Sequence, residues 1–305
     1  MASPQLQNIS SMLRSRRSAA AETASIDISA LRAAIEIGGR FFGPDPATAT
    51  DAVSADGVPG EWVSAEGASS DATIYYLHGG GHAIGSIESH RGLISRISKA
   101  SGARAFAIDY RLAPENPYPA GLEDSVKVYR WLLAHGIPPS RIVIAGDSAG
   151  GNLALATLLA LKDAGEPLPA ATVLLSPWTD LTGSGDSMQT RADVDPMIMA
   201  DPAHLTARQY AGDTPLDHPL VSPLFGDLSG LPPMLIHVGD YELLLDDSTR
   251  LADRAKQAGV DVTLEVWPEM IHVWHFFAPM VPEATEAIEV IGKFIRSHVP
   301  AEVTA

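Results

Sequence analysis

Residues 141–150 read Arg-Ile-Val-Ile-Ala-Gly-Asp-Ser-Ala-Gly and form the most informative pattern for the fold. An apolar run with β character ends in a G-x-S-x-G pattern, residues 146–150, and a stretch rich in Ala and Leu follows. Strand, serine turn and helix in this order are the context of a nucleophile elbow, which exposes a serine hydroxyl at a sharp turn. The flanking glycines avoid collisions at that turn, and the start of the helix favours developing negative charge. We therefore predict Ser148 as a nucleophile.

The same alternation of short β-rich runs and longer helical segments extends along the chain. The β-rich runs are 73–77, 105–108, 141–145, 171–175, 234–238 and 262–266, and the helical segments are 88–101, 122–135, 152–164, 248–258 and 282–297. Runs that are apolar throughout indicate parallel strands buried on both faces by helices. The predicted fold class is therefore α/β, with a mostly parallel central sheet flanked by helices.

Two segments depart from this alternation. Residues 1–45 have helical spacing with no strand before them, and residues 185–220 are rich in proline and methionine. We predict that both form a cap over one end of the sheet, so that the core consists of residues 46–184 and 221–305. The soft methionine side chains suit an adaptable apolar pocket, although they fit the core of a small helical insert equally well.

Composition excludes several classes of protein. The 305 residues include 37 acidic and 21 basic side chains, a net charge of 21 − 37 = −16, which argues against nucleic acid as a partner. No run approaches the ~18 apolar residues of a membrane span, so we expect no membrane partner. The absence of cysteine excludes disulfides, thiolate metal sites and a cysteine nucleophile. The twin arginines Arg16 and Arg17 precede no apolar export segment, and we expect a cytoplasmic protein.

A second glycine-rich stretch, His78-Gly79-Gly80-Gly81-His82, directly follows the run 73–77. Consecutive glycines allow backbone N–H groups to point into a cavity, as the stabilisation of an oxyanion requires. We predict the N–H groups of Gly79 and Gly80 as donors, with that of Ala149 as the third. The alternatives are a flexible hinge or a phosphate loop, but the Lys and Ser/Thr of a P-loop are missing. The two histidines are four apart, yet the glycines between them disfavour a helix, so we predict no metal site.

A serine nucleophile needs a histidine base and a carboxylate that orients it. In proteins with a nucleophile elbow, the acid and the histidine both follow the serine in the chain. They lie in loops at the carboxyl ends of later strands. The loop after the run 234–238 supplies three acids, Asp240, Glu242 and Asp246. The loop after the last strand run supplies His272 and His275. Spacing alone leaves the three acids and the two histidines open.

Taken together, these motifs resemble those of the bacterial hormone-sensitive-lipase-like esterases (family IV) of the α/β-hydrolase superfamily, over residues 72 to 297. The resemblance rests on the two glycine motifs and on Asp109-Tyr110-Arg111-Leu112-Ala113-Pro114-Glu115. The family acid lies in a pattern like Asp-Pro-Leu-x-Asp-Glu, where this chain has Glu242 in place of Asp and Leu243 in place of Pro. The resemblance therefore implies Glu242 as the acid and His272 as the base. It also implies a helical cap.

The function that the resemblance implies is that of a serine carboxylesterase acting on short- to medium-chain acyl esters. Ser148, His272 and Glu242 would act through an acyl-enzyme, without a cofactor. The expected partners are a small-molecule ester and, through the region of the last strand run, a second copy of the chain. Two alternatives are an amide or formamide hydrolase with the same triad and a non-catalytic member of the fold that binds a small molecule.

Overall fold

The computed structural model describes residues 2–21 and 27–299, in which eight strands form one sheet in the order β1-β2-β4-β3-β5-β6-β7-β8. Residues 1, 22–26 and 300–305, which belong to the predicted N-terminal cap and to the second part of the core, lie outside the described residues. The strands are β1 Ala49–Ala55, β2 Val58–Ser64, β3 Ser69–Leu77, β4 Ala103–Ile108, β5 Ile142–Asp147, β6 Ala171–Leu175, β7 Met234–Gly239 and β8 Val262–Trp267.

All neighbouring pairs from β4 to β8 are parallel, whereas β2 runs antiparallel to both β1 and β4. The predicted α/β fold with a mostly parallel central sheet is confirmed. The hairpin β1–β2 is not among the predicted strands. Its turn is Asp56-Gly57, with φ of 51° and 89°, and a two-residue Asp-Gly turn is the sequence signal of such a hairpin. β1 is mostly exposed and therefore lacks the apolar run that predicts each of the strands β3 to β8.

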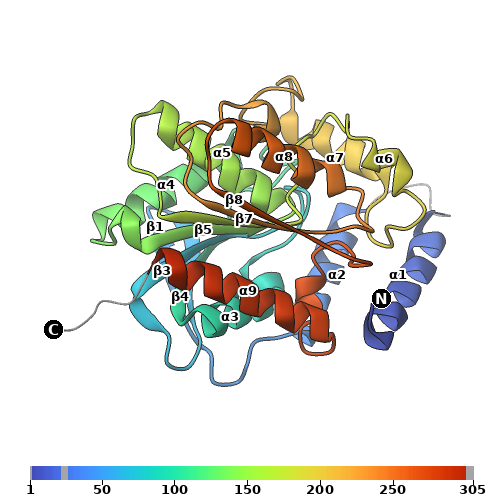
Figure 1. Cartoon of the computed structure of the whole chain (residues 1–305), viewed down its shortest axis with the longest axis horizontal. Helices are drawn as coiled ribbons and strands as arrows, with labels where there is room; N and C mark the ends of the chain where they lie inside the picture. Colours follow the sequence, from blue (N-terminus) through green and yellow to red (C-terminus); the bar gives the residue numbers. More distant parts are fainter. Residues whose placement is uncertain (1, 22–26, 300–305) are drawn as a thin grey trace.

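Helices cover both faces of the sheet (Figure 1). The longer helices of the core are α3 Ile87–Ser101, α4 Ala120–Ala134, α5 Ala149–Asp163, α8 Leu245–Gln257 and α9 Pro282–His298. Successive side chains of β3 alternate between the two layers, because Tyr75 and Leu77 pack in the cluster with α4, α5 and α8, whereas Ile74 and Tyr76 pack in the cluster with α3 and α9. This burial on both faces is what the continuous apolar runs predict.

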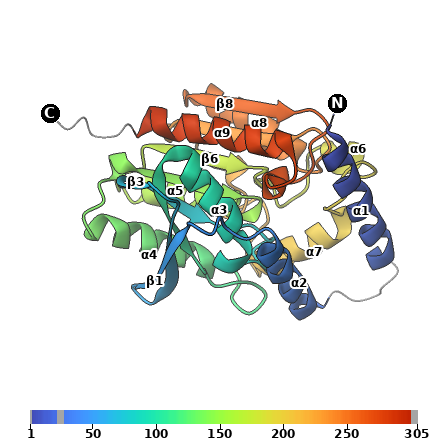
Figure 2. The same cartoon turned by 90° about the horizontal axis from the view of Figure 1, so that it is seen from below.

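Four further helices gather at one end of the sheet (Figure 2). They are α1 Pro4–Ala21, α2 Ile28–Phe41, α6 Ser187–Thr190 and α7 Ala200–Ala211. The first two lie within the predicted cap segment 1–45 and the last two within 185–220, while the exact division into cap and core stays a prediction. Across the described residues, none of the helices combines the length and the apolar character needed to traverse a membrane.

Candidate active site

Ser148 lies between the last residue of β5 and the first residue of α5, in a backbone conformation that is rare for a side-chain-bearing residue. Its φ is 53° and its ψ is −121°. Space at this turn is so limited that a Cβ atom at Gly146 would lie 2.4 Å from the carbonyl oxygen of Gly150, and one at Gly150 would lie 2.0 Å from that of Leu77. Only glycine fits at both positions. The strained turn therefore presents Ser148 at the carboxyl end of the sheet.

The N–H group of Gly79 does not face the site. It donates to Asp147 Oδ1 at 3.1 Å and lies 3.2 Å from His90 Nε2. The preceding carbonyl, that of His78, accepts a hydrogen bond from Tyr110 at 2.7 Å. The prediction of Gly79 as an oxyanion donor is therefore wrong, because its N–H is bound to a buried carboxylate behind the loop.

The next two peptide groups of the loop are oriented the other way. His78 Nδ1 donates to the carbonyl of Gly79 at 2.8 Å, and the carbonyl of Gly80 accepts from the N–H groups of Ala83 and Ile84 at 3.1 and 3.0 Å. In a planar trans peptide the N–H points opposite to the C=O. The N–H groups that follow these two carbonyls, those of Gly80 and Gly81, therefore point away from these partners, and both glycines line the cavity described below.

Glu242 and His272 are brought together from two different loops. His272 Nδ1 donates to Glu242 Oε2 at 2.8 Å. The other oxygen of Glu242 accepts from Ser176 Oγ at 2.7 Å and from the N–H of Gly239 at 2.6 Å. The Glu242 side chain is fully buried, so these three donors hold its carboxylate in one orientation. Glu242, which is longer than the Asp of the family pattern, thus reaches His272.

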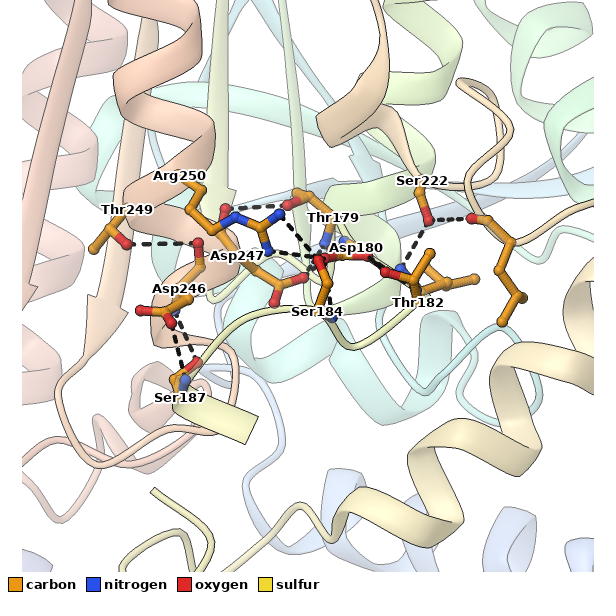
Figure 3. A network of polar contacts seen from close by, with 12 residues as sticks. Thr179, Asp180, Thr182, Ser184, Ser187, Ser222, Asp246, Asp247, Thr249 and Arg250 are labelled. Carbon is orange, nitrogen blue, oxygen red and sulfur yellow. Dashed lines mark hydrogen bonds and ion pairs between the residues drawn. The ribbon is translucent and has the colours of Figure 1, made fainter. Parts of the chain in front are cut away.

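The other candidates for acid and base have different partners. The Asp240 carboxylate accepts the N–H of Glu269, and that of Asp246 accepts the N–H of Ser187 at 2.9 Å (Figure 3). His275 is fully buried and its Nε2 lies 3.2 Å from Nδ1 of His237. Of the residues that spacing left open, the structure pairs only Glu242 with His272.

The charge state of His272 is set by opposing effects. Burial disfavours the imidazolium, but the hydrogen bond and the charge of Glu242, with the charges of Asp195 and Asp147, outweigh it and raise the pKa of His272 above its ordinary value. Ser148 Oγ makes no direct hydrogen bond to His272 among the described residues. Such bonds are often long in a free enzyme and tighten when substrate is bound.

Ser148 and His272 open onto one largely apolar cavity of about 440 Å³. Helix α2 contributes Ile28, Leu31 and Ile35, and the segment before α7 contributes Met197, Ile198 and Met199. Met197 and Met199 line this cavity, which favours the pocket over the core of a helical insert, the two interpretations of the methionine-rich segment. Among the described residues that line the cavity there is neither lysine nor arginine, so these walls offer no basic side chain to pair with an anionic ligand.

Comparison with known proteins places this site in a family. The sequence matches the family model of the alpha/beta hydrolase fold over residues 74–276. A crystal structure of an esterase from the bacterial hormone-sensitive lipase family is 47% identical, with a TM-score of 0.93, and the match covers 98% of this chain and 99% of that one. The chain belongs to this family. The predicted resemblance and the predicted class, a carboxylic ester hydrolase, are confirmed by these matches.

Other proteins to which the chain is similar are also named as hydrolases or esterases. An acetyl-hydrolase of Streptomyces hygroscopicus is 44% identical over 97% of this chain and 98% of its own length. An esterase of Acinetobacter venetianus is 38% identical over 88% of each chain. The structure of EstE5 soaked with p-nitrophenyl butyrate is 43% identical, with a TM-score of 0.93 and coverage of 98% of this chain and 100% of that one.

Sequence reasoning missed two members of the site. Gly81 lines the cavity, whereas the Gly79 N–H is bound to Asp147, and a count of glycines could not distinguish them because the direction of each N–H depends on what binds the neighbouring carbonyl. The spacing of His78 to His82 raises only the question of a metal ligand, yet the His78 ring hydrogen-bonds to the carbonyl of Gly79. Burial lowers the pKa of His78 to about 3, so the ring stays neutral and donates through Nδ1.

Proposed function

We propose that this chain is a serine carboxylesterase that hydrolyses short- to medium-chain acyl esters through Ser148, His272 and Glu242. The observation that carries the proposal is the 2.8 Å contact between His272 and Glu242 at a cavity that Ser148 also lines. A nucleophile, a base and a fixed carboxylate at one cavity are the parts that acyl transfer needs.

In the proposed reaction His272 takes the proton of Ser148 while the hydroxyl oxygen attacks the ester carbonyl. Glu242 holds the imidazole in the required tautomer and stabilises its protonated form. The N–H groups of Gly80, Gly81 and Ala149 stabilise the tetrahedral oxyanion. His272 then protonates the leaving alcohol, and an acyl-enzyme remains. Water attacks the acyl-enzyme by the same route, releases the acid and regenerates the serine.

The preference for shorter acyl groups is supported by the size of the cavity and by two relatives. About 440 Å³ lies toward the lower end of the usual range for ligand pockets, ~300–1,000 Å³. One relative is named an acetyl-hydrolase, and the structure of another was obtained after soaking with p-nitrophenyl butyrate. Both names refer to small acyl groups.

A series of p-nitrophenyl esters tests the proposal. Acetate and butyrate should be hydrolysed faster than octanoate, and palmitate slowest. Ser148→Ala should lower kcat on the order of 10⁶-fold on every ester. A wild-type enzyme that hydrolyses none of the four esters, or a Ser148→Ala variant with substantial activity, would contradict the proposal. An amide series in the same assay identifies an amidase.

A further inference from the structure

Asp195, a fully buried carboxylate of the segment 185–220, links two parts of the site. Its Oδ2 accepts the N–H of Leu243 at 2.9 Å, and Leu243 directly follows Glu242. Its Oδ1 accepts the N–H groups of Met197 and Ile198 at 2.8 and 2.9 Å. One buried side chain therefore ties the loop that carries the acid to a segment that lines the cavity.

The residue at position 243 makes this link available. The family pattern described above has proline at this position, and proline has no N–H to donate. Leu243 supplies an N–H, and Asp195 accepts it. Glu242 has one more rotatable bond than an aspartate, so a fixed backbone beside it limits the freedom that the longer acid would otherwise have.

The charge of Asp195 also acts on the pKa of His272. The ionisable groups that act on this histidine come from four elements: Glu242 from the loop after β7, Asp147 from β5, His275 from the 3₁₀-helix Trp274–Phe277, and Asp195 itself. The charge of Asp195 is one of the contributions that raise the pKa of His272. His275 stays neutral, because burial holds its pKa well below the ordinary value.

We propose that Asp195 is a positioning residue, which holds the Glu242 loop against the cavity wall and adds negative charge that favours protonated His272 during acyl transfer. This inference rests on the proposed function, since it requires His272 as the base. Asp195 would act through Glu242 and His272 without contact with the ester. A displacement of the cavity wall at Met197 and Ile198 would then also displace Glu242 relative to His272.

The variant Asp195→Asn tests both roles. Asparagine retains the size of the side chain and one oxygen acceptor but loses the charge and the acceptor for Leu243. With p-nitrophenyl butyrate we expect kcat to fall about tenfold while KM changes less, and the acid limb of the pH profile to move to lower pH by about half a unit. A folded variant with wild-type kcat and an unshifted limb would overturn the proposal.

Asp180, which lies in the same connection between β6 and β7, provides a matched control. It is also a buried carboxylate, and it accepts hydrogen bonds from Thr182 and Ser184 and pairs with Arg250 (Figure 3). It is not among the groups that act on His272. Asp180→Asn should lower the melting temperature without moving the acid limb. An equal shift in both variants would mean general loosening and would overturn the assignment to Asp195.

Two further measurements separate the possible failures. If Asp195→Asn does not fold, Leu243→Pro is the alternative, because it removes the N–H that Asp195 accepts and leaves every charge in place. We then expect kcat to fall several-fold with an unshifted acid limb. A wild-type kcat would overturn the proposed role of the Leu243–Asp195 hydrogen bond. Wild-type enzyme that is inactive on all esters would contradict the proposed function instead. In that case NMR titration of the His272 ring still tests Asp195, because the charge should raise its midpoint in the wild type relative to Asp195→Asn.

Discussion

Arg32 of α2 forms a two-pronged ion pair with Glu115, with N–O distances of 2.8 and 2.7 Å. The same guanidinium donates to the carbonyl of Ala83 at 2.8 Å and to that of Ala113 at 3.0 Å. Ala83 closes the turn that orients the Gly81 N–H. Arg32 thereby joins α2, a helix that lines the cavity, to the glycine loop. None of the sequence motifs suggests this connection.

We predict that Arg32→Ala lowers kcat for p-nitrophenyl butyrate by about ten- to a hundredfold, since small displacements of catalytic groups have effects of this size. Steady-state kinetics should show a larger change in kcat than in KM. Arg40→Ala is the control, because Arg40 lies on the same helix but pairs with Glu88. Equal losses in the two variants would argue against a specific role for Arg32.

Glu242→Gln should lower kcat by about 10⁴, because the histidine would lose the carboxylate that fixes its tautomer. Asp240→Asn and Asp246→Asn should stay within about tenfold of wild type, since their carboxylates bind backbone N–H groups elsewhere. Kinetics on the three purified variants checks the assignment. A large loss in Asp240→Asn with an active Glu242→Gln would transfer the role to Asp240.

His78→Ala should lower kcat by about 10²–10³ with little change in KM, because the Gly79 carbonyl loses its donor and the Gly80 N–H is no longer held toward the cavity. His78→Asn should recover part of the loss, since its side-chain amide can donate from a similar position. Measurement of both variants beside their melting temperatures separates orientation from the lost stacking on Tyr110. Identical kcat values for the two variants would argue against the orienting bond.

Activity should depend on pH through His272. The ring must be neutral to take the proton of Ser148, and its pKa is raised above the ordinary 6.5. Activity is therefore expected at alkaline pH and is lost as pH falls through the raised value. A profile of kcat/KM against pH should give an acid limb with a midpoint above 6.5. A midpoint below that value would show that burial outweighs the charge of Glu242.

A dimer is predicted at the edge of the sheet. Within the described part of the chain, β8 pairs with β7 alone, and Val266 on this strand is 43% exposed, so its backbone edge can extend a sheet into a second copy. Sedimentation at micromolar concentration should show a species of twice 32.2 kDa, and Val266→Lys should shift it toward monomer. A single species of 32.2 kDa in the wild type would contradict the prediction.

Much of the architecture could be read from local patterns. The apolar runs at 142–145 and 234–238 identify buried parallel strands because nearly every side chain in them is apolar. The elbow at Ser148 was predictable because its strain is local and demands glycine at fixed neighbouring positions. The exposed strand β1 was not, since its side chains carry no apolar pattern.

The local patterns of the sequence thus predict the strands β3 to β8, the family resemblance, Ser148 as the nucleophile and a short set of candidates for acid and base. Only the folded chain shows that Glu242, and not Asp240 or Asp246, lies against His272, and that the Gly79 N–H is turned away from the cavity. These choices depend on which atoms of distant segments meet: Ser176 and Gly239 on the glutamate, and Asp147 on the Gly79 N–H. The direction of a peptide group or a carboxylate is set by such long-range partners, and no spacing along the chain encodes it.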